Sequence, residues 1–427
     1  MLRDQDSNNL LNGVRSSYVL KIILENVNKR AYYQVFRYNK RLKERIELTL
    51  EDYHQLYKIY SKLEIEITPL KFYPYFLKRN FININNNDSF YHMYYLEEDG
   101  KKSEEIIKDG SFKKNYKKIL IIIDTEFESL NGLFKDIKAI YKIKFLKFKR
   151  IDITDMSEMF SGCTNLVDID CSKFITFNVT NMSNMFSKCK DLEYLDLSNF
   201  NTKNVIDMSS MFEGCDSLRE IKLSNFNTQN VKTMNSMFYD CSNLDNLDLS
   251  NFKTDNVTDM ALMFYNCSSL ENLNLSNFNT KNVINMKSMF SLCSSLTQLN
   301  LLSFNCINVM NMFEMFASCC SLKNLNLSNL KTEKVRNMSG MFKECIKLKK
   351  LDISKFNLDN LIDASKMFSE CKNLKELNLP EIEQNEKIKM VGMFSFCNKE
   401  LKRQIKSKNK NLKKEAFYEP LDIAYPF

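Results

Sequence analysis

The 427-residue chain has few of the residues on which many enzymes depend, with 8 glycines, 5 prolines, 2 histidines and no tryptophan. Neither GxGxxG nor GxxxxGK[ST] occurs, so the glycine-rich loops that hold nucleotide phosphates are excluded. His54 and His92 are the only imidazoles, which rules out a three-histidine zinc site and limits histidine base catalysis to two positions. None of the 13 cysteines forms a CxxC pair, so zinc ribbons and fingers are excluded. We therefore expect a protein that is not an enzyme and that holds no cofactor or metal.

Long apolar runs are also missing. No stretch of about 18 apolar residues occurs, so no transmembrane helix is expected. The first residues lack the apolar segment of a secretory signal, which favours a cytoplasmic protein and leaves the cell surface as the alternative. Thirteen cysteines are an odd number, which argues against a fully paired disulfide framework.

An internal repeat dominates the chain. Ten cysteines recur every 26 residues, at 163, 189, 215, 241, 267, 293, 319, 345, 371 and 397. Ten Met-Phe pairs keep the same spacing, from Met159-Phe160 to Met393-Phe394, and nine further methionines stand three residues before such pairs. A unit of this size cannot bury its apolar face alone, so neighbouring units must stack. The spacing therefore predicts a solenoid in which like residues lie above like.

Each unit combines two periodicities. Met286, Met289, Phe290, Cys293 and Leu296 fall at i, i+3, i+4, i+7 and i+10, which predicts one apolar helical stripe. In nine units an N-cap type of residue precedes the stripe: Asp155, Asn181, Asp207, Thr233, Asp259, Asn285, Asn311, Asn337 and Asp363. After the stripe, leucines alternate with polar residues, as in a half-buried strand. We therefore predict a capped helix, a turn, a short strand and a return loop in every coil, with the strands joined in a parallel sheet.

The chain is predicted to contain three regions. Residues 1–125 suggest a small α+β domain, with helices at 16–27, 31–38 and 48–63, a hairpin at 90–109 around Asp99-Gly100 and a buried strand at 117–124. This domain is expected to dock on the N-terminal end of the repeats. The repeats span 126–400, where 126–150 form a degenerate first coil, and 401–427 form a basic cap or tail. The predicted fold class is an α/β repeat solenoid of about eleven 26-residue coils.

The repeats resemble a known family. The units LDLSNFNTKNVIDMSSMFEGCDSL (195–218) and LNLSNFNTKNVINMKSMFSLCSSL (273–296) are similar to the BspA-like leucine-rich repeats of bacterial and protist surface proteins. The resemblance covers about 126–400 and implies a leucine-rich-repeat-like solenoid used for adhesion or protein binding, without catalytic residues. We expect a non-enzymatic protein-interaction scaffold. A BspA-like cell-surface adhesin is one alternative, and a faint F-box-like pattern in the first two helices makes a substrate adaptor another.

Two columns of the repeat allow a functional or a structural interpretation. Stacked cysteines and methionines suit a soft metal such as Cu(I), but they share a stripe with phenylalanine and leucine, so buried, inert core thiols are favoured. Disulfides along the column are not expected, because stacked cysteines point the same way. The second column is an asparagine row that either binds a ligand or satisfies loop backbone groups, and the latter is favoured. It consists of Asn178, Asn204, Asn230, Asn256, Asn282, Asn308 and Asn360.

Partner binding is best sought at the polar positions of the strands, which should form the open face of the sheet. At these positions the coils up to 274 carry six acidic and two basic side chains, and those from 323 on carry four basic and two acidic ones. Such a graded polar face suits a protein partner. The candidates are Glu193, Tyr194, Asp196, Glu220, Asp245, Asn272, Gln298, Asn324 and Lys350.

Charge gives little support to nucleic-acid binding. The repeats are mildly acidic, and neutralising phosphates needs clustered lysine and arginine. The run KRQIKSKNKNLKK (402–414) could contact an anionic surface or act as a nuclear-targeting signal, but a solvated cap helix is favoured.

One stretch replaces polar column positions with apolar residues. Leu302 stands in a serine column, Cys306 in a threonine column and Phe313 at the second position of a predicted helix. Cys320 follows Cys319, one of the ten regularly spaced cysteines, which we call the ladder cysteines. Ile346 holds the place of Cys320 one coil later. Drift within the core is the simpler explanation, and a contact patch containing Leu302 and Phe313 is the functional hypothesis.

Overall fold

The computed structural model describes residues 62–70, 81–83, 91–96, 101–105, 117–123, 129–148, 150, 152–381 and 387–419. Contacts divide the chain into two units, residues 1–62 and 63–427. The predicted helices at 16–27 and 31–38, with their F-box-like pattern, lie outside the described residues, as does His54. Of the predicted helix at 48–63, the two described residues are not helical, because Leu63 begins a strand.

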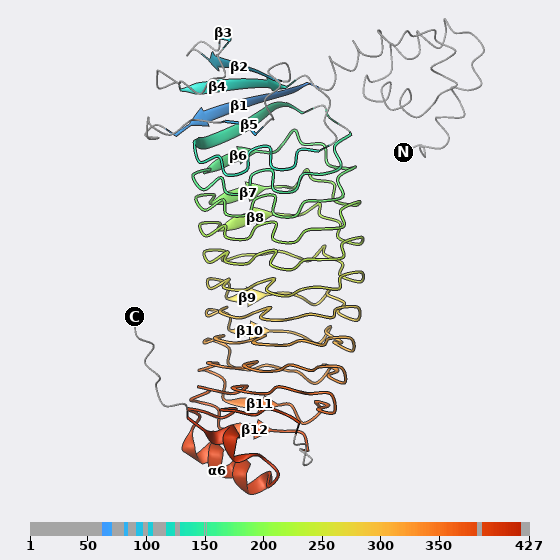
Figure 1. Ribbon diagram of the computed structural model, residues 1–427, viewed down its shortest axis with the longest axis vertical. Helices are drawn as coiled ribbons and strands as arrows, with labels where there is room; N and C mark the ends of the chain where they lie inside the picture. Colours follow the sequence, from blue (N-terminus) through green and yellow to red (C-terminus); the bar gives the residue numbers. More distant parts are fainter. Residues whose placement is uncertain are drawn as a thin grey trace, which may run out of the picture. The chain divides into compact units, whose positions relative to one another are not determined.

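A six-stranded sheet begins the second unit. Its strands are β1 (Leu63–Pro69), β2 (Tyr91–Leu96), β3 (Lys102–Glu105), β4 (Lys118–Ile123), β5 (Ile140–Phe148) and β6 (Asp168–Asp170). They lie in the order β3-β2-β4-β1-β5-β6, antiparallel as far as β5 and parallel between β5 and β6 (Figure 1). The predicted hairpin strands and the predicted buried strand are confirmed as β2, β3 and β4. Strand β1 was not among the predicted elements, although apolar and polar residues alternate in LEIEIT (63–68), and the structure buries Leu63, Ile65 and Ile67.

From β5 onward the strands pair in parallel, and every pair joins residues 26 positions apart. The predicted parallel pairing is therefore confirmed, but beyond β6 it is divided into separate two-stranded sheets and does not form one continuous sheet. In each strand the middle or last leucine or isoleucine faces the core, whereas its neighbours face outward. The short strands are β7 (Tyr194–Asp196), β8 (Glu220–Lys222), β9 (Asn272–Leu273), β10 (Gln298–Leu299), β11 (Lys350–Asp352) and β12 (Glu376–Asn378).

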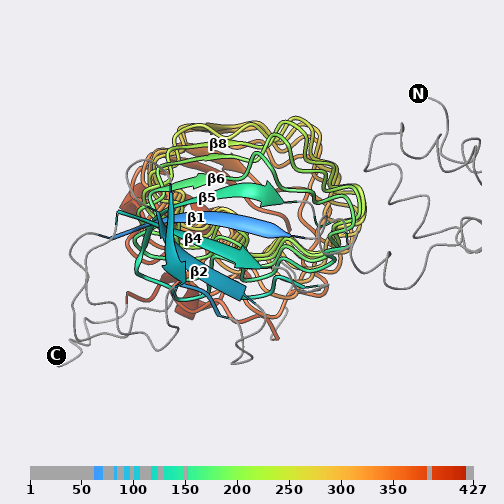
Figure 2. The same cartoon turned by 90° about the horizontal axis from the view of Figure 1, so that it is seen from above.

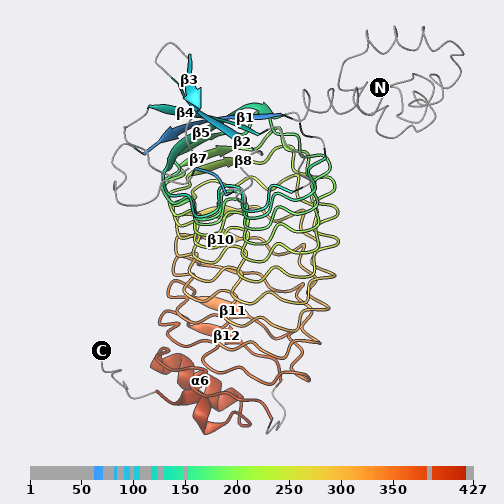
Figure 3. The same cartoon turned by 45° about the horizontal axis from the view of Figure 1, so that its top comes forward.

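A column of parallel bridges joins the coils away from these strands. It starts at Ser129 and Asp155 and steps by 26 residues to Asp363 and Lys389. The coils consequently lie one above another between the sheet of β1–β5 and helix α6 (Lys399–Lys408), as Figure 3 shows. Seen along the stack in Figure 2, successive coils nearly superpose.

The apolar stripe of each coil forms consecutive turns, so the prediction of one helix per coil is wrong. The repeats are therefore β-rich and not α/β as predicted. In one coil, Met159 N–H donates to Met156, Ser161 to Glu158 and Cys163 to Phe160, each three residues back. The N–H groups of Glu158 and Phe160 donate instead to Ser183 and Met185 of the next coil, at 2.9 and 2.8 Å. Within the described residues α6 is the only α-helix.

Stacking distance explains this departure from the sequence pattern. Hydrogen-bonded backbones lie about 4.8 Å apart, whereas packed helices need about 8–10 Å between their axes. A helix in every coil would therefore prevent the bonds between coils on that side. Turns allow them, with a positive φ at Glu158 (56°) and at Gly162 (74°). At Gly162 an added Cβ would meet the carboxylate of Asp136, so glycine suits this position for two reasons.

The residues predicted as helix N-caps begin these turns. Asp207 Oδ1 accepts a hydrogen bond from Ser209 N–H at 2.8 Å, and Asn337 Oδ1 accepts one from Ser339 N–H at 2.9 Å. An N-cap accepts the same kind of bond, so these side chains cannot indicate on their own whether a helix or a turn follows.

Aromatic rings and thiols fill the core. Phenylalanine rings stack from Phe134 through Phe160 and Phe186 as far as Phe394, and the Phe160–Phe186 centroids lie 5.4 Å apart. All ten ladder cysteines are buried, and so are all the methionines of the repeat columns, which confirms their interpretation as core residues. All thirteen cysteines are free thiols.

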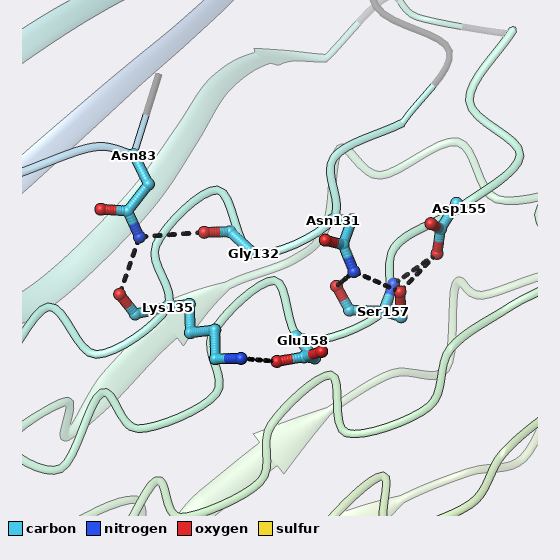
Figure 4. Close-up of polar contacts among 7 residues, drawn as sticks. All are labelled: Asn83, Asn131, Gly132, Lys135, Asp155, Ser157 and Glu158. Carbon is cyan, nitrogen blue, oxygen red and sulfur yellow. Dashed lines mark hydrogen bonds and ion pairs between the residues drawn. The ribbon is translucent and has the colours of Figure 1, made fainter. Parts of the chain in front are cut away.

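Asn83 closes the N-terminal end of the stack. In the interior, N–H groups of one coil donate to carbonyls of the next, so the first coil has carbonyls without an earlier donor. Asn83 donates its backbone N–H to Leu133 O at 2.8 Å. Its side-chain Nδ2 donates to Gly132 O and Lys135 O at 3.0 and 2.7 Å (Figure 4). Asn83 thus supplies donors in the place of a preceding coil.

The degenerate first coil keeps the polar links of the later ones. Asn131 Nδ2 donates to Ser157 Oγ at 2.6 Å, and Lys135 forms an ion pair with Glu158 (Figure 4). Ser157 in turn donates its backbone N–H and its hydroxyl to Asp155 Oδ1, at 2.9 and 2.6 Å. The first two coils are therefore joined by side chains as well as by backbone.

The C-terminal end is closed by a 3₁₀ turn, η1 (Lys414–Phe417). Gly392 N–H and Phe394 N–H donate to the carbonyls of Glu415 and Ala416, both at 2.8 Å, where a following coil would otherwise accept. The Phe417 ring extends the aromatic stack, 5.3 Å from Phe394. Helix α6 overlaps the start of the basic run and buries Leu401 and Ile405, in agreement with the cap-helix interpretation of that run.

Candidate partner-binding groove

A groove of about 1280 Å³ follows the outer face of the strand segments from residues 246–248, one coil before β9, to β12. Its floor consists of the strand leucines Leu247, Leu273, Leu299, Leu325 and Leu351. Two rows of outward side chains stand over this floor, because residues on either side of an inward leucine face out. The first row is Asn246, Asn272, Gln298, Asn324, Lys350 and Glu376. The second row is Asp248, Asn274, Asn300, Asn326, Asp352 and Asn378.

The side chains of the second row take part in turns of the backbone. Asn274, Asn300 and Asn326 each accept a hydrogen bond through Oδ1 from the N–H two residues on, at 3.1, 3.1 and 3.0 Å. Asp248 and Asp352 do the same. Backbone donation from Ser250 lowers the pKa of Asp248, and side-chain and backbone donation from Ser354 lowers the pKa of Asp352. Both aspartates therefore stay ionised near neutral pH.

The first row has no such structural role. Asn246, Asn272, Gln298 and Asn324 are exposed, and their side-chain amides bond to no other residue in the part of the chain that the structure describes. Amides elsewhere in the repeats do brace neighbouring coils. Four exposed amides in a row are thus available to a ligand.

Within the two rows, charged side chains lie toward the ends of the groove. At one end Lys350 and Glu376 form an ion pair at 2.8 Å. Beyond the other end, Tyr194 donates to Asp196 at 3.3 Å, and Lys222 Nζ lies 5.3 Å from the centre of the Tyr194 ring. The middle of the groove is left without charge.

The predicted partner-binding residues divide into three groups. Asn272, Gln298, Asn324, Lys350 and Leu302 line the groove. Phe313 is half-buried in the turns, where Lys287 Nζ lies 5.6 Å from its ring centre, and it does not line the groove. The remaining residues lie on earlier coils and do not line the groove. They face outward from the corresponding strand segments of those coils: Glu193, Tyr194, Asp196, Glu220 and Asp245.

Of the apolar residues that interrupt polar columns, Cys306 belongs to the core. This side chain is 1% exposed and lies 3.8 Å from Met286 Sδ, because the threonine column that it interrupts faces inward. Leu302 is an exposed side chain, with 50% of its surface accessible, whereas Cys320 is only partly exposed. The sequence showed a change of polarity at these positions but not which of them reach the surface.

The asparagine row of the return loops braces the backbone, as the favoured interpretation predicted. Asn204 Nδ2 donates to Phe177 O at 2.7 Å, Asn230 to Lys203 O at 2.8 Å and Asn256 to Gln229 O at 2.7 Å. Each of these bonds joins two successive coils. A ligand-binding role for that row is therefore not supported.

Burial governs the chemistry of the thiols. Burial raises the pKa of Cys163, Cys215 and Cys293 to about 12. Among the described residues, no group of three or more histidine, cysteine or acidic side chains could hold a metal ion. His92 lies in β2, with its ring centre 6.5 Å from that of Tyr94. None of the helices in the described ranges is long and apolar enough to cross a membrane.

Comparison with known proteins shows which family the repeats belong to. No curated protein matches the chain. A solved structure titled "Crystal structure of TLR13-ssRNA13 complex" is similar at 19% identity and a TM-score of 0.28, over 54% of this chain and 40% of that one. The family described as "Mycoplasma protein of unknown function, DUF285" matches residues 128–245, 195–300, 217–323 and 297–408. These matches together span more than half of the sequence, and the chain therefore belongs to the DUF285 family.

Proposed function

We propose that this protein is a non-enzymatic protein-interaction scaffold, built as a BspA-like, leucine-rich-repeat-like solenoid of eleven coils. Eleven residues of the bridge column, one in each coil from Ser129 to Lys389, support the repeat count. The groove supports the function, because its first row exposes a run of side-chain amides that form no hydrogen bond with the described residues. A surface of this kind can hold a partner by hydrogen bonds without further folding.

Site-specific photo-crosslinking in living cells tests this proposal. Benzoylphenylalanine replaces Gln298 in the groove, and in a matched control it replaces Gln229, an exposed glutamine on a return loop. We expect a discrete protein adduct from position 298 and none from position 229. The absence of any adduct at 298, or equal adducts at both positions, contradicts the proposal.

A cell-surface adhesin is the second candidate, favoured by the similarity of units such as 195–218 to BspA-like repeats. It would use the same groove on another side of the membrane. Protease treatment of intact cells separates the two candidates, since an adhesin is digested before lysis and an internal scaffold only after it.

A further inference from the structure

We propose that the uncharged middle of the groove binds an extended polypeptide in the polyproline II conformation through its main-chain peptide groups, an inference that rests on the proposed scaffold function. This uncharged section consists of Asn272, Gln298 and Asn324 of the first row and Asn274, Asn300 and Asn326 of the second.

Hydrogen-bonding capacity is the first argument. A side-chain amide carries two N–H donors and a carbonyl acceptor, the groups that a peptide backbone also offers. In the second row Oδ1 is occupied by turn bonds, so these asparagines offer chiefly their Nδ2 donors. Donors therefore outnumber acceptors in the section. The complementary ligand is one rich in free carbonyls, and a polyproline II backbone makes no internal hydrogen bonds.

Spacing is the second argument. Asn272 and Gln298 come from paired strands about 4.8 Å apart, and the same spacing carried on to the next coil returns an amide after about 9.6 Å. A polyproline II chain rises about 3.1 Å per residue with three residues per turn, which returns the same face after about 9.3 Å. A polypeptide lying along the stack can thus present an equivalent carbonyl to every second coil over this section.

Charge and the one exposed apolar side chain decide between ligand classes. Neither row carries a charge from Asn272 to Asn326, so phosphate-rich chains lack the cations that they need there. Among the described residues, no aromatic ring on which a sugar ring could stack lines the groove. Leu302, which is half exposed and part of the groove lining, can contact one aliphatic side chain of the peptide. These features favour a polypeptide over a nucleic acid or a glycan.

Titration with defined peptides tests the inference on the full chain. The probe is an acetylated and amidated peptide of four Leu-Pro-Pro repeats, and the comparison peptide has Gly-Gly in place of each Pro-Pro. We expect the proline peptide to bind more tightly, because its conformation is preformed. The double variant Asn272→Leu/Gln298→Leu should weaken binding about tenfold, the loss expected for two hydrogen bonds. Gln229→Leu is the matched control and should leave binding unchanged.

Several results would overturn the inference. The inference fails if the proline peptide does not bind at concentrations up to about 1 mM. It also fails if the glycine peptide binds equally well, or if the double variant keeps its full affinity for the proline peptide. A neutral oligosaccharide that binds and is lost in the double variant would assign the groove to glycans instead. An adduct at position 298 in cells without peptide binding would retain the scaffold and reject this ligand. The absence of both would reject the scaffold itself.

Discussion

The thiol of Cys293 donates a hydrogen bond to the backbone carbonyl of Phe264, one coil earlier, across 3.0 Å. Every ladder cysteine from Cys163 to Cys397 repeats this contact with the carbonyl of the phenylalanine 29 residues before it. The column of thiols therefore packs the core and also satisfies buried carbonyl groups between coils.

Thiol labelling of the native protein should be slow at the ladder and faster at Cys320. The ladder cysteines are buried and their pKa values are raised, so the reagent cannot reach them and few of them ionise to the reactive thiolate. The pKa of Cys320 is raised too, but its side chain is partly exposed to the reagent. Mass spectrometry after brief alkylation checks this, and Cys320→Ser should remove the fastest site. Denaturation should expose all 13 thiols. Rapid labelling of several ladder cysteines in the folded state would contradict their burial.

Stability should fall as the pH rises above about 9. A thiol ionises near 9.0 in the unfolded chain, but burial raises the pKa of Cys215 and Cys293 to about 12. Between these values the unfolded chain binds fewer protons, so alkaline pH favours unfolding. Urea unfolding followed by circular dichroism from about pH 8 to about pH 10.5 checks this. Cys293→Ala should show a shallower pH dependence, and an unchanged slope would refute the linkage.

Phe264→Ala should destabilise the coils around it by about 3–5 kcal/mol, the range for buried aromatic truncations. The Phe264 ring is fully buried, 5.8 Å from Phe238 and 5.6 Å from Phe290. Because unfolding in a stack can be local, hydrogen exchange over residues 250–290 is the appropriate measurement. Phe313→Ala is the control and should cost less, since that ring is half-buried. Unchanged protection in Phe264→Ala would show that the ring does not support the core.

Phe417→Ser should loosen the C-terminal cap and promote self-association. The Phe417 ring packs on Phe394, and the adjacent Glu415 and Ala416 occupy the last N–H groups of the stack. Loss of that packing would expose an unpaired edge of the kind that recruits other chains. Sedimentation velocity and the thermal midpoint check this. Tyr418→Ser, at a side chain that is 59% exposed, should leave the protein monodisperse. Identical behaviour of the two variants would argue against a capping role for the Phe417 ring.

The open face of the sheet was predictable as a surface but not as a site. Alternation around Leu273 and Leu299 indicates which neighbours face outward, and the structure agrees. Asn272 and Asn274 are the same residue type two positions apart, and only the structure shows that Asn274 supports a turn whereas the Asn272 amide faces outward. The partner of a side-chain oxygen depends on how the backbone bends, which residue identity does not specify.

Sequence by itself determined the 26-residue period, the parallel pairing and nearly the whole buried core, because identical spacing forces like residues to stack. Only the tertiary structure decided that the stripe from Met286 to Leu296 forms turns. Spacings of i, i+3, i+4 and i+7 suit both conformations, and hydrogen bonds between closely stacked coils select the turn. Tertiary structure also decided that Asn83 closes the stack, since its partner carbonyls lie about 50 residues further along the chain.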